Sequence, residues 1–160
     1  MLKPNSLRAT LLASVPGLNV DPDRLQIFLD EGRIIATGAH SHSFEYAYTL
    51  NAIITEYAGH ADAIVVPVLS WLHVNQPDLL DNPDKRRDGF VFEADLLSHG
   101  GVDLSLKIQL TERVVVRQGE GGALTAEHCS EPPDDPRADV ERWTLFIKGE
   151  PVASWPPVLP

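Results

Sequence analysis

Residues 44–55 alternate between apolar and more polar side chains with a period of two. The apolar positions are Phe44, Tyr46, Tyr48, Leu50, Ala52 and Ile54. A period of two is the repeat of a β-strand, and an α-helix would scatter these side chains around its axis. The segment therefore predicts a long strand with one apolar face. We interpret its three aromatic residues as core side chains, which need a covering layer of helices.

Further strands are predicted on both sides of this segment. Residues 25–29 and 33–37 are β-prone and are separated by Asp30-Glu31-Gly32, so we predict a hairpin whose loop, Asp30–Arg33, projects from the sheet. Residues 90–97 and 102–111 form a second predicted hairpin across 98–101, and 114–116 extend its second strand. These patterns indicate a mostly antiparallel sheet.

Two segments have the periodicity of helices. The apolar positions of residues 4–15 are Leu7, Leu11, Leu12 and Val15, and those of residues 60–74 are Ile64, Val65, Val68, Leu69, Trp71 and Leu72. Pro67 either kinks the second helix or marks its first turn, because an interior proline removes a helical hydrogen bond. Residues 75–88 are predicted to be a long exposed connection.

The predicted fold class is α+β, with a mostly antiparallel sheet and two helices packed on one of its faces. This domain is expected to span residues 1–126. Residues 127–160 are expected to form an acidic, proline-rich linker to Arg142 and a small β-hairpin from Trp143 to Ser154. Since a lone hairpin is barely stable in water, it needs a surface on its own domain or on a neighbouring subunit.

Composition excludes several classes of protein. The chain has 160 residues and a formal net charge of -10, which disfavours sequence-independent binding to nucleic acid. The single cysteine, Cys129, gives no disulfide framework and suggests a reducing compartment. We expect no signal peptide at the start and no membrane contact. The basic group Lys85-Arg86-Arg87 is either a solvated turn or a contact for an acidic partner.

The search for catalytic chemistry finds little. No glycine-rich phosphate loop is present, and the neighbouring His128 and Cys129 lie where the chain becomes polar. His40 and His42, with His60 and Asp62, could converge on a divalent metal, which leaves a metal-dependent hydrolase as a remote alternative. We interpret them instead as polar loop residues. We therefore expect a protein that is not an enzyme and has no cofactor or metal.

Particular segments of the chain resemble a known family. They are Asp21–Leu25, Phe28–Gly38, Ser43–Leu50, Tyr57–His60, Trp71–Leu80 and Leu110–Val114, in collinear order within residues 2–128. Together they are similar to the tail completion protein R (GpR) family of P2-like contractile-tailed phages. Residues after Cys129 have no counterpart in the resemblance.

The resemblance implies a structural virion protein similar to phage tail terminators. Such a protein would form a ring, expected to be hexameric, at the head-proximal end of the tail. It would contact the tail tube protein, the sheath protein and the head–tail connector, stop polymerisation, and be assembled in the host cytoplasm. Genomic DNA would pass through the acidic lumen without specific binding. Another neck, connector or tube subunit is the alternative.

Candidate contact residues follow from the predicted loops and from the terminal hairpin. In the loops they are Asp30, Glu31, Arg33, Asn75, Gln76, Arg86 and Arg87. In the hairpin they are Trp143, Phe146 and Trp155, which either clasp a neighbouring subunit or pack on their own domain. The loops could also be solvent-exposed without any partner.

Overall fold

The computed structural model describes residues 1–36, 38, 40–98, 100–131 and 140–156. The helices are α1 (Lys3–Ser14), α2 (Asp62–Asn75), α3 (Pro77–Asp81) and α4 (Pro83–Arg86), with 3-10 turns at Pro22–Arg24 and Glu120–Gly122. The strands are β1 (Leu25–Ala36), β2 (Phe44–Tyr57), β3 (Phe90–Leu96), β4 (Val102–Gln118), β5 (Leu124–His128), β6 (Trp143–Ile147) and β7 (Glu150–Trp155). No helix among these residues is long and apolar enough to cross a lipid bilayer.

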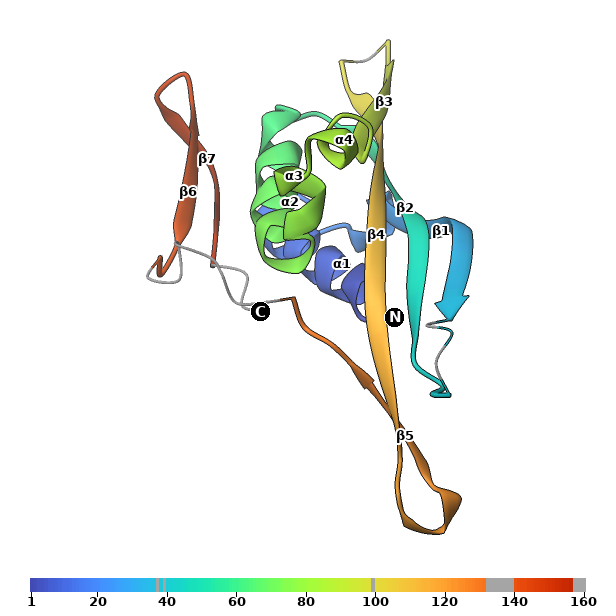
Figure 1. The fold of residues 1–160 in the computed structure, drawn as a ribbon. Helices are drawn as coiled ribbons and strands as arrows, with labels where there is room; N and C mark the ends of the chain where they lie inside the picture. The colour runs from blue at the N-terminus through green and yellow to red at the C-terminus, as the bar shows by residue number, and fades with distance from the viewer. Residues whose placement is uncertain (37, 39, 99, 132–139, 157–160) are drawn as a thin grey trace.

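Five strands form one antiparallel sheet in the order β1-β2-β4-β3, with β5 pairing farther along β4. The two long central strands place Leu50 opposite Ile108 and Ala52 opposite Leu106, and all four side chains are fully buried. The alternation in residues 44–55 therefore predicted the strand and its core face correctly, but of the three aromatic residues only Tyr48 is buried, and Phe44 and Tyr46 are half-buried. The helices lie on that face (Figure 1), so the α+β class is confirmed.

The helical layer is built from α1 and α2, which pack against each other. Leu7 and Leu11 of α1 and Trp71 of α2 are fully buried over the sheet. The Trp71 indole N–H donates to Ser6 Oγ at 3.0 Å, which links the two helices. Since α2 begins at Asp62, Pro67 lies inside the helix and does not mark its first turn.

The predicted hairpin at Asp30–Arg33 is wrong. Residues 25–36 are one continuous strand, and both halves pair with β2: Asp30 lies opposite Thr49 and Arg33 opposite Ala47. Two residues of β1 thus face one residue of β2, which is a β-bulge, and Glu31 adopts a left-handed conformation with φ of 55°. The turn-like sequence adds one residue to the strand and does not reverse the chain, so these residues form no projecting loop.

The predicted connection over residues 75–88 is also only partly correct. It contains two short helices, and Pro77 and Pro83 each begin one of them, because proline needs no N–H partner in a first turn. Leu79 is 2% exposed and belongs to the core. The charged residues of α4 remain exposed, as expected.

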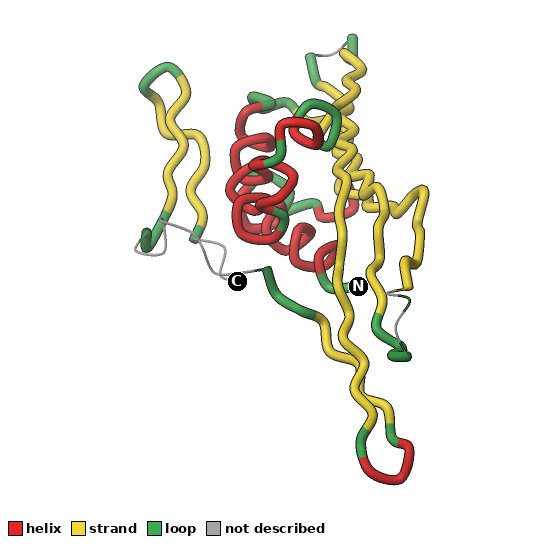
Figure 2. Tube along the Cα trace, viewed as in Figure 1, coloured by secondary structure: helices red, strands yellow, loops and turns green. Residues whose placement is uncertain are grey.

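The terminal hairpin predicted for residues 143–154 is confirmed as β6 and β7, which form a separate two-stranded sheet beside α2 (Figure 2). Strand β7 contacts α1, and Trp143 and Trp155 line a small cleft with Leu69 of α2. The hairpin therefore rests on its own domain. Half of the predicted linker, residues 132–139, lies outside the described residues.

Candidate assembly surfaces

A buried carboxylate, Glu112 of β4, connects several parts of the molecule. Its side chain is 4% exposed and accepts hydrogen bonds from the Leu2 backbone N–H at 2.6 Å and from the Tyr48 hydroxyl at 2.5 Å. The Lys3 backbone N–H donates a longer hydrogen bond of 3.4 Å to Glu112 Oε1, and His128 Nδ1 of β5 lies 3.2 Å from Glu112 Oε2. Because α1 has no capping side chain of its own, Glu112 supplies a carboxylate to the open N–H groups of its first turn.

Tyr48 has a strongly perturbed ionisation in this cluster. Burial raises the pKa of its hydroxyl far above the usual value, and the hydrogen bond to Glu112 and the charge of that carboxylate raise the pKa further. The tyrosine is therefore neutral and donates a hydrogen bond to Glu112 under all ordinary conditions. The pair is consistent with a structural role.

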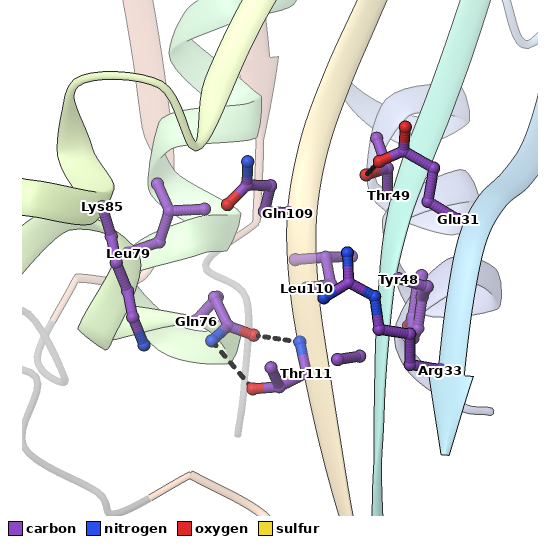
Figure 3. A pocket seen from close by; sticks show the side chains of 11 residues that line it. Glu31, Arg33, Tyr48, Thr49, Gln76, Leu79, Lys85, Gln109, Leu110 and Thr111 are labelled. Atoms are coloured by element: carbon purple, nitrogen blue, oxygen red, sulfur yellow. Dashed lines mark hydrogen bonds between the residues drawn. The ribbon is translucent and has the colours of Figure 1, made fainter. Parts of the chain in front are cut away.

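A second polar contact secures the edge of β4 and the segment that follows β5. The Gln76 side chain accepts the Thr111 N–H at 3.0 Å and donates to Thr111 Oγ1 at 3.2 Å (Figure 3). Lys3 Nζ donates to Gln76 at 2.9 Å and to Glu131 at 2.8 Å. The edge of β4 that faces away from β2 is therefore hydrogen-bonded along its length by three successive partners. These are β3 at residues 102–108, Gln76 at Thr111 and β5 at residues 114–118.

Strands β4 and β5 continue beyond Phe44, the first residue of β2, as a two-stranded arm (Figure 1). We define this arm as residues 114–128. One face of the arm continues the core face of the sheet with Val116, Leu124 and Ala126, and Leu124 is 53% exposed. The other face carries Arg117 and Glu127, 3.7 Å apart. An isolated two-stranded ribbon is marginal in water, so the arm is suited to lie on another molecule.

The two outer strands of the sheet also expose large apolar side chains. On β1 these are Phe28, Leu29, Ile34 and Ile35, and on β3 they are Val91, Phe92 and Leu96. The outward edges of β1 and β3 have no partner strand in the described part of the chain. Open strand edges are normally protected by charge, bulges or covering segments, so apolar open edges indicate association.

A groove of about 210 Å³ crosses the sheet near the bulge of β1. Glu31 and Arg33 border it on β1, and Gln109 borders it on β4 (Figure 3). At the far side it reaches Leu79 and Lys85, and Lys85 forms an ion pair with Asp78. Its lining is mixed in charge and holds no arrangement typical of catalysis.

The predicted contact residues are dispersed over the molecule. Asp30, Glu31 and Arg33 are exposed on β1, Asn75 and Trp143 are half-buried, and Arg86 and Arg87 are exposed on α4. Gln76 is 4% exposed and supports the sheet, so it offers little surface. Of the hairpin aromatics, Trp155 is 2% exposed and packs on its own domain, whereas Phe146 is 59% exposed.

Sequence reasoning missed Glu112, although a signal was present. The residue has the same parity as Leu104, Leu106, Ile108 and Leu110, so it continues the buried face of β4. An acidic residue in phase with a core face predicts a buried, bonded carboxylate. The exposed apolar edges could not be recognised in this way, because the sequence does not show which strands are outermost.

The residues of the remote metal-site alternative are not brought together as a cluster. His60 Nδ1 and Asp62 lie 3.3 Å apart at the start of α2, and His40 and His42 are exposed in the loop before β2. Among the described residues, no group of three or more histidine, cysteine, aspartate or glutamate side chains is placed to hold a metal. The free thiol, Cys129, is exposed.

Comparison with known proteins gives the family. The sequence model of the P2 phage tail completion protein R (GpR) family matches residues 1–132. The chain belongs to this family. It is also 44% identical over 155 residues to the tail completion protein R of Escherichia phage P2, covering 97% of this chain and 99% of the relative. No solved structure gives a significant match.

Membership in the GpR family agrees with the earlier resemblance and extends it. The relative of phage P2 covers the terminal hairpin as well, although the family model ends at residue 132. Phage tail completion is a structural role in the virion, and the distinctive features of this chain are exposed apolar strand edges and an extended arm. The buried polar cluster around Glu112 joins α1, β2 and β5 to β4.

Proposed function

We propose that this protein completes a phage tail as a terminator. Several copies form a ring, taken to be a hexamer, at the head-proximal end of the tail. There the ring caps the tube and sheath, stops their polymerisation and offers a docking surface to the head–tail connector. The family relationship over nearly the whole chain carries the proposal. In this role the protein is a structural component and not an enzyme.

The shape of the sheet supports ring formation. Its two open edges, β1 and β3, differ in sequence, so one edge of a copy can meet the other edge of the next copy. Contacts between two different patches are heterologous, and they close into a ring when the rotation between copies allows it. The arm and the exposed Phe146 leave further surface for the tube, the sheath and the connector.

The net charge of -10 suits a ring around a DNA channel. A lumen of the same sign as the phosphate backbone lets DNA pass without specific binding. The exposed acidic residues near the groove on β1 are Asp30 and Glu31. These residues are candidates for the lumen or for the tube-facing surface.

Purified tail tube protein of the same phage provides the test. Tubes are polymerised with increasing amounts of this protein, and tube length is measured by negative-stain electron microscopy. A terminator gives tubes that are capped at one end and do not grow when fresh tube protein is added. A tube subunit, which is the alternative, would polymerise alone or be incorporated along the tube. Tubes that keep growing at saturating concentrations of this protein contradict capping.

A further inference from the structure

The last four residues of β1 and the first four of β3 form two matching open edges. On β1, Ile34 is 71% exposed and Ile35 is 50% exposed. On β3, Phe92 is 67% exposed and Val91 is 41% exposed. Each edge therefore has one large apolar side chain on each face of the sheet, at adjacent positions.

The register within the sheet shows which backbone groups are available at these edges. The Gln109 N–H donates to the Gly89 carbonyl, so the odd-numbered residues of β3 face β4, and Phe90 and Phe92 direct their backbone groups outward. The Thr111 N–H faces away from β2 toward Gln76. Backbone N–H and C=O groups alternate between the two sides of each strand, so the same reasoning carries through β2 to β1. At the end of β1, the backbone groups of Arg33 and Ile35 face β2, and the backbone groups of Ile34 and Ala36 face outward.

One antiparallel register matches residues 33–36 of β1 with residues 90–93 of β3. It places Ile34 opposite Phe92, with both backbones directed outward and both side chains on the core face. In the same register Ile35 lies opposite Val91 on the other face. Such directly opposed apolar pairs are the units that stabilise antiparallel strands.

This register also pairs opposite charges. Arg33 falls opposite Glu93, on the same face of the sheet. Arg33 is exposed and forms no ion pair within the described residues, and the Glu93 carboxylate binds Lys107 through one oxygen, Oε1, at 2.7 Å. Beyond the bulge of β1, the same register would bring the carboxylates of Asp30 and Asp95 close together. Because like charges repel, the matched segment ends at Arg33.

We propose that β1 of one copy pairs with β3 of the next, through residues 33–36 and 90–93, and continues the sheet across the subunit boundary. The partner is a second copy of this chain. Since β1 and β3 run in opposite directions within a copy, copies related by rotation about an axis along the strands meet antiparallel, as this register requires. The inference deepens the proposed ring and rests on it.

A cysteine pair tests the register in assembled tails. In a Cys129→Ser background, Ile35→Cys with Val91→Cys places two thiols at a pair without mutual hydrogen bonds, whose Cα atoms are about 4.5 Å apart in an antiparallel ladder. A mild oxidant should then give multimers on a non-reducing gel, up to a closed ring. Ile35→Cys with Leu96→Cys is the mismatched control. Multimers from the control alone, or no multimers in normal tails, would overturn the pairing.

Charge reversal provides an independent measurement in full-length protein. Arg33→Glu and Glu93→Arg should each reduce infectious particles at least about tenfold, because like charges then oppose each other at every boundary of the ring. The double variant should recover most of the loss, and Arg8→Glu on α1 is the matched control. Melting temperature verifies that each variant folds.

The outcomes separate this inference from the proposed function. If tails lacking the protein are normal in length and infectivity, the terminator role fails whatever the cross-links show. If tails require the protein but neither cross-linking nor charge rescue occurs, the edge pairing is wrong and the terminator role stands. Rescue together with the multimer ladder supports both.

Discussion

Replacement of Glu112 by glutamine tests the polar cluster that joins α1, β2, β4 and β5. The two carboxylate oxygens accept different donors: Tyr48 donates to Oε1 and the Leu2 N–H donates to Oε2. A glutamine side chain has only one acceptor oxygen, so its amide nitrogen meets one of these donors. One charge-assisted bond, worth about 1.5–3 kcal/mol, is lost and the other becomes a weaker neutral bond.

We therefore expect Glu112→Gln to lower the free energy of unfolding by about 2–4 kcal/mol. For a chain of this size the melting temperature would fall by about 5–15 °C. Urea unfolding followed by tryptophan fluorescence measures the change, since Trp71 is fully buried. The matched control is Glu93→Gln on β3, whose exposed carboxylate contacts Lys107 and should matter little. A Glu112→Gln stability within about 0.5 kcal/mol of the wild type would refute the reasoning.

Three further predictions concern the same core. Burial, more than the bond to Glu112, raises the pKa of Tyr48, so near pH 10 this residue ionises only in the unfolded state. The free energy of unfolding should therefore be unaffected by Tyr48 below that pH and fall above it by about 1.4 kcal/mol per pH unit. Tyr48→Phe should flatten this decline in urea titrations. Ser6→Ala leaves the Trp71 indole N–H without its acceptor and should cost about 1–3 kcal/mol in the same assay; an unchanged midpoint would contradict this. Trp155→Ala should speed proteolysis within the hairpin, residues 143–154, whereas Phe146→Ala should not, and equal rates would show that the hairpin is not docked through Trp155.

The sequence predicted the elements whose pattern is carried by many residues. Alternation over residues 44–55 predicted β2 and its buried face, because each strand position is fixed by the same core. The helical spacing around Trp71 likewise predicted α2. Several independent side chains agree in these segments, and one unusual residue such as Pro67 does not change the outcome.

The sequence was misleading where a short segment allows two backbone paths. Asp30-Glu31-Gly32 can close a hairpin or form a bulge, and the choice depends on whether β2 is long enough to pair with both halves of β1. The same holds for Gln76, whose buried position depends on a gap between β3 and β5 on the edge of β4. Such outcomes are set by tertiary contacts and have no local signal.

The candidate assembly surfaces were predictable only in part. The resemblance pointed to a ring-forming tail protein, and Arg33 was among its candidate contacts. Ile34, Phe92 and Glu93 were not, because an exposed apolar edge in the folded sheet looks like ordinary core in the sequence. Their place in the proposed edge pairing follows from the strand order, which only the structure provides.

The most direct test of the terminator role is to image tails from particles made with and without this protein. Negative-stain electron microscopy gives the length of the tube and the fraction joined to heads. The account predicts overlong or ragged tubes that fail to join heads when the protein is absent, and restoration when it is supplied. Tubes of normal length that still fail to attach would place it in the connector, and normal tails with full infectivity would contradict a role in tail completion.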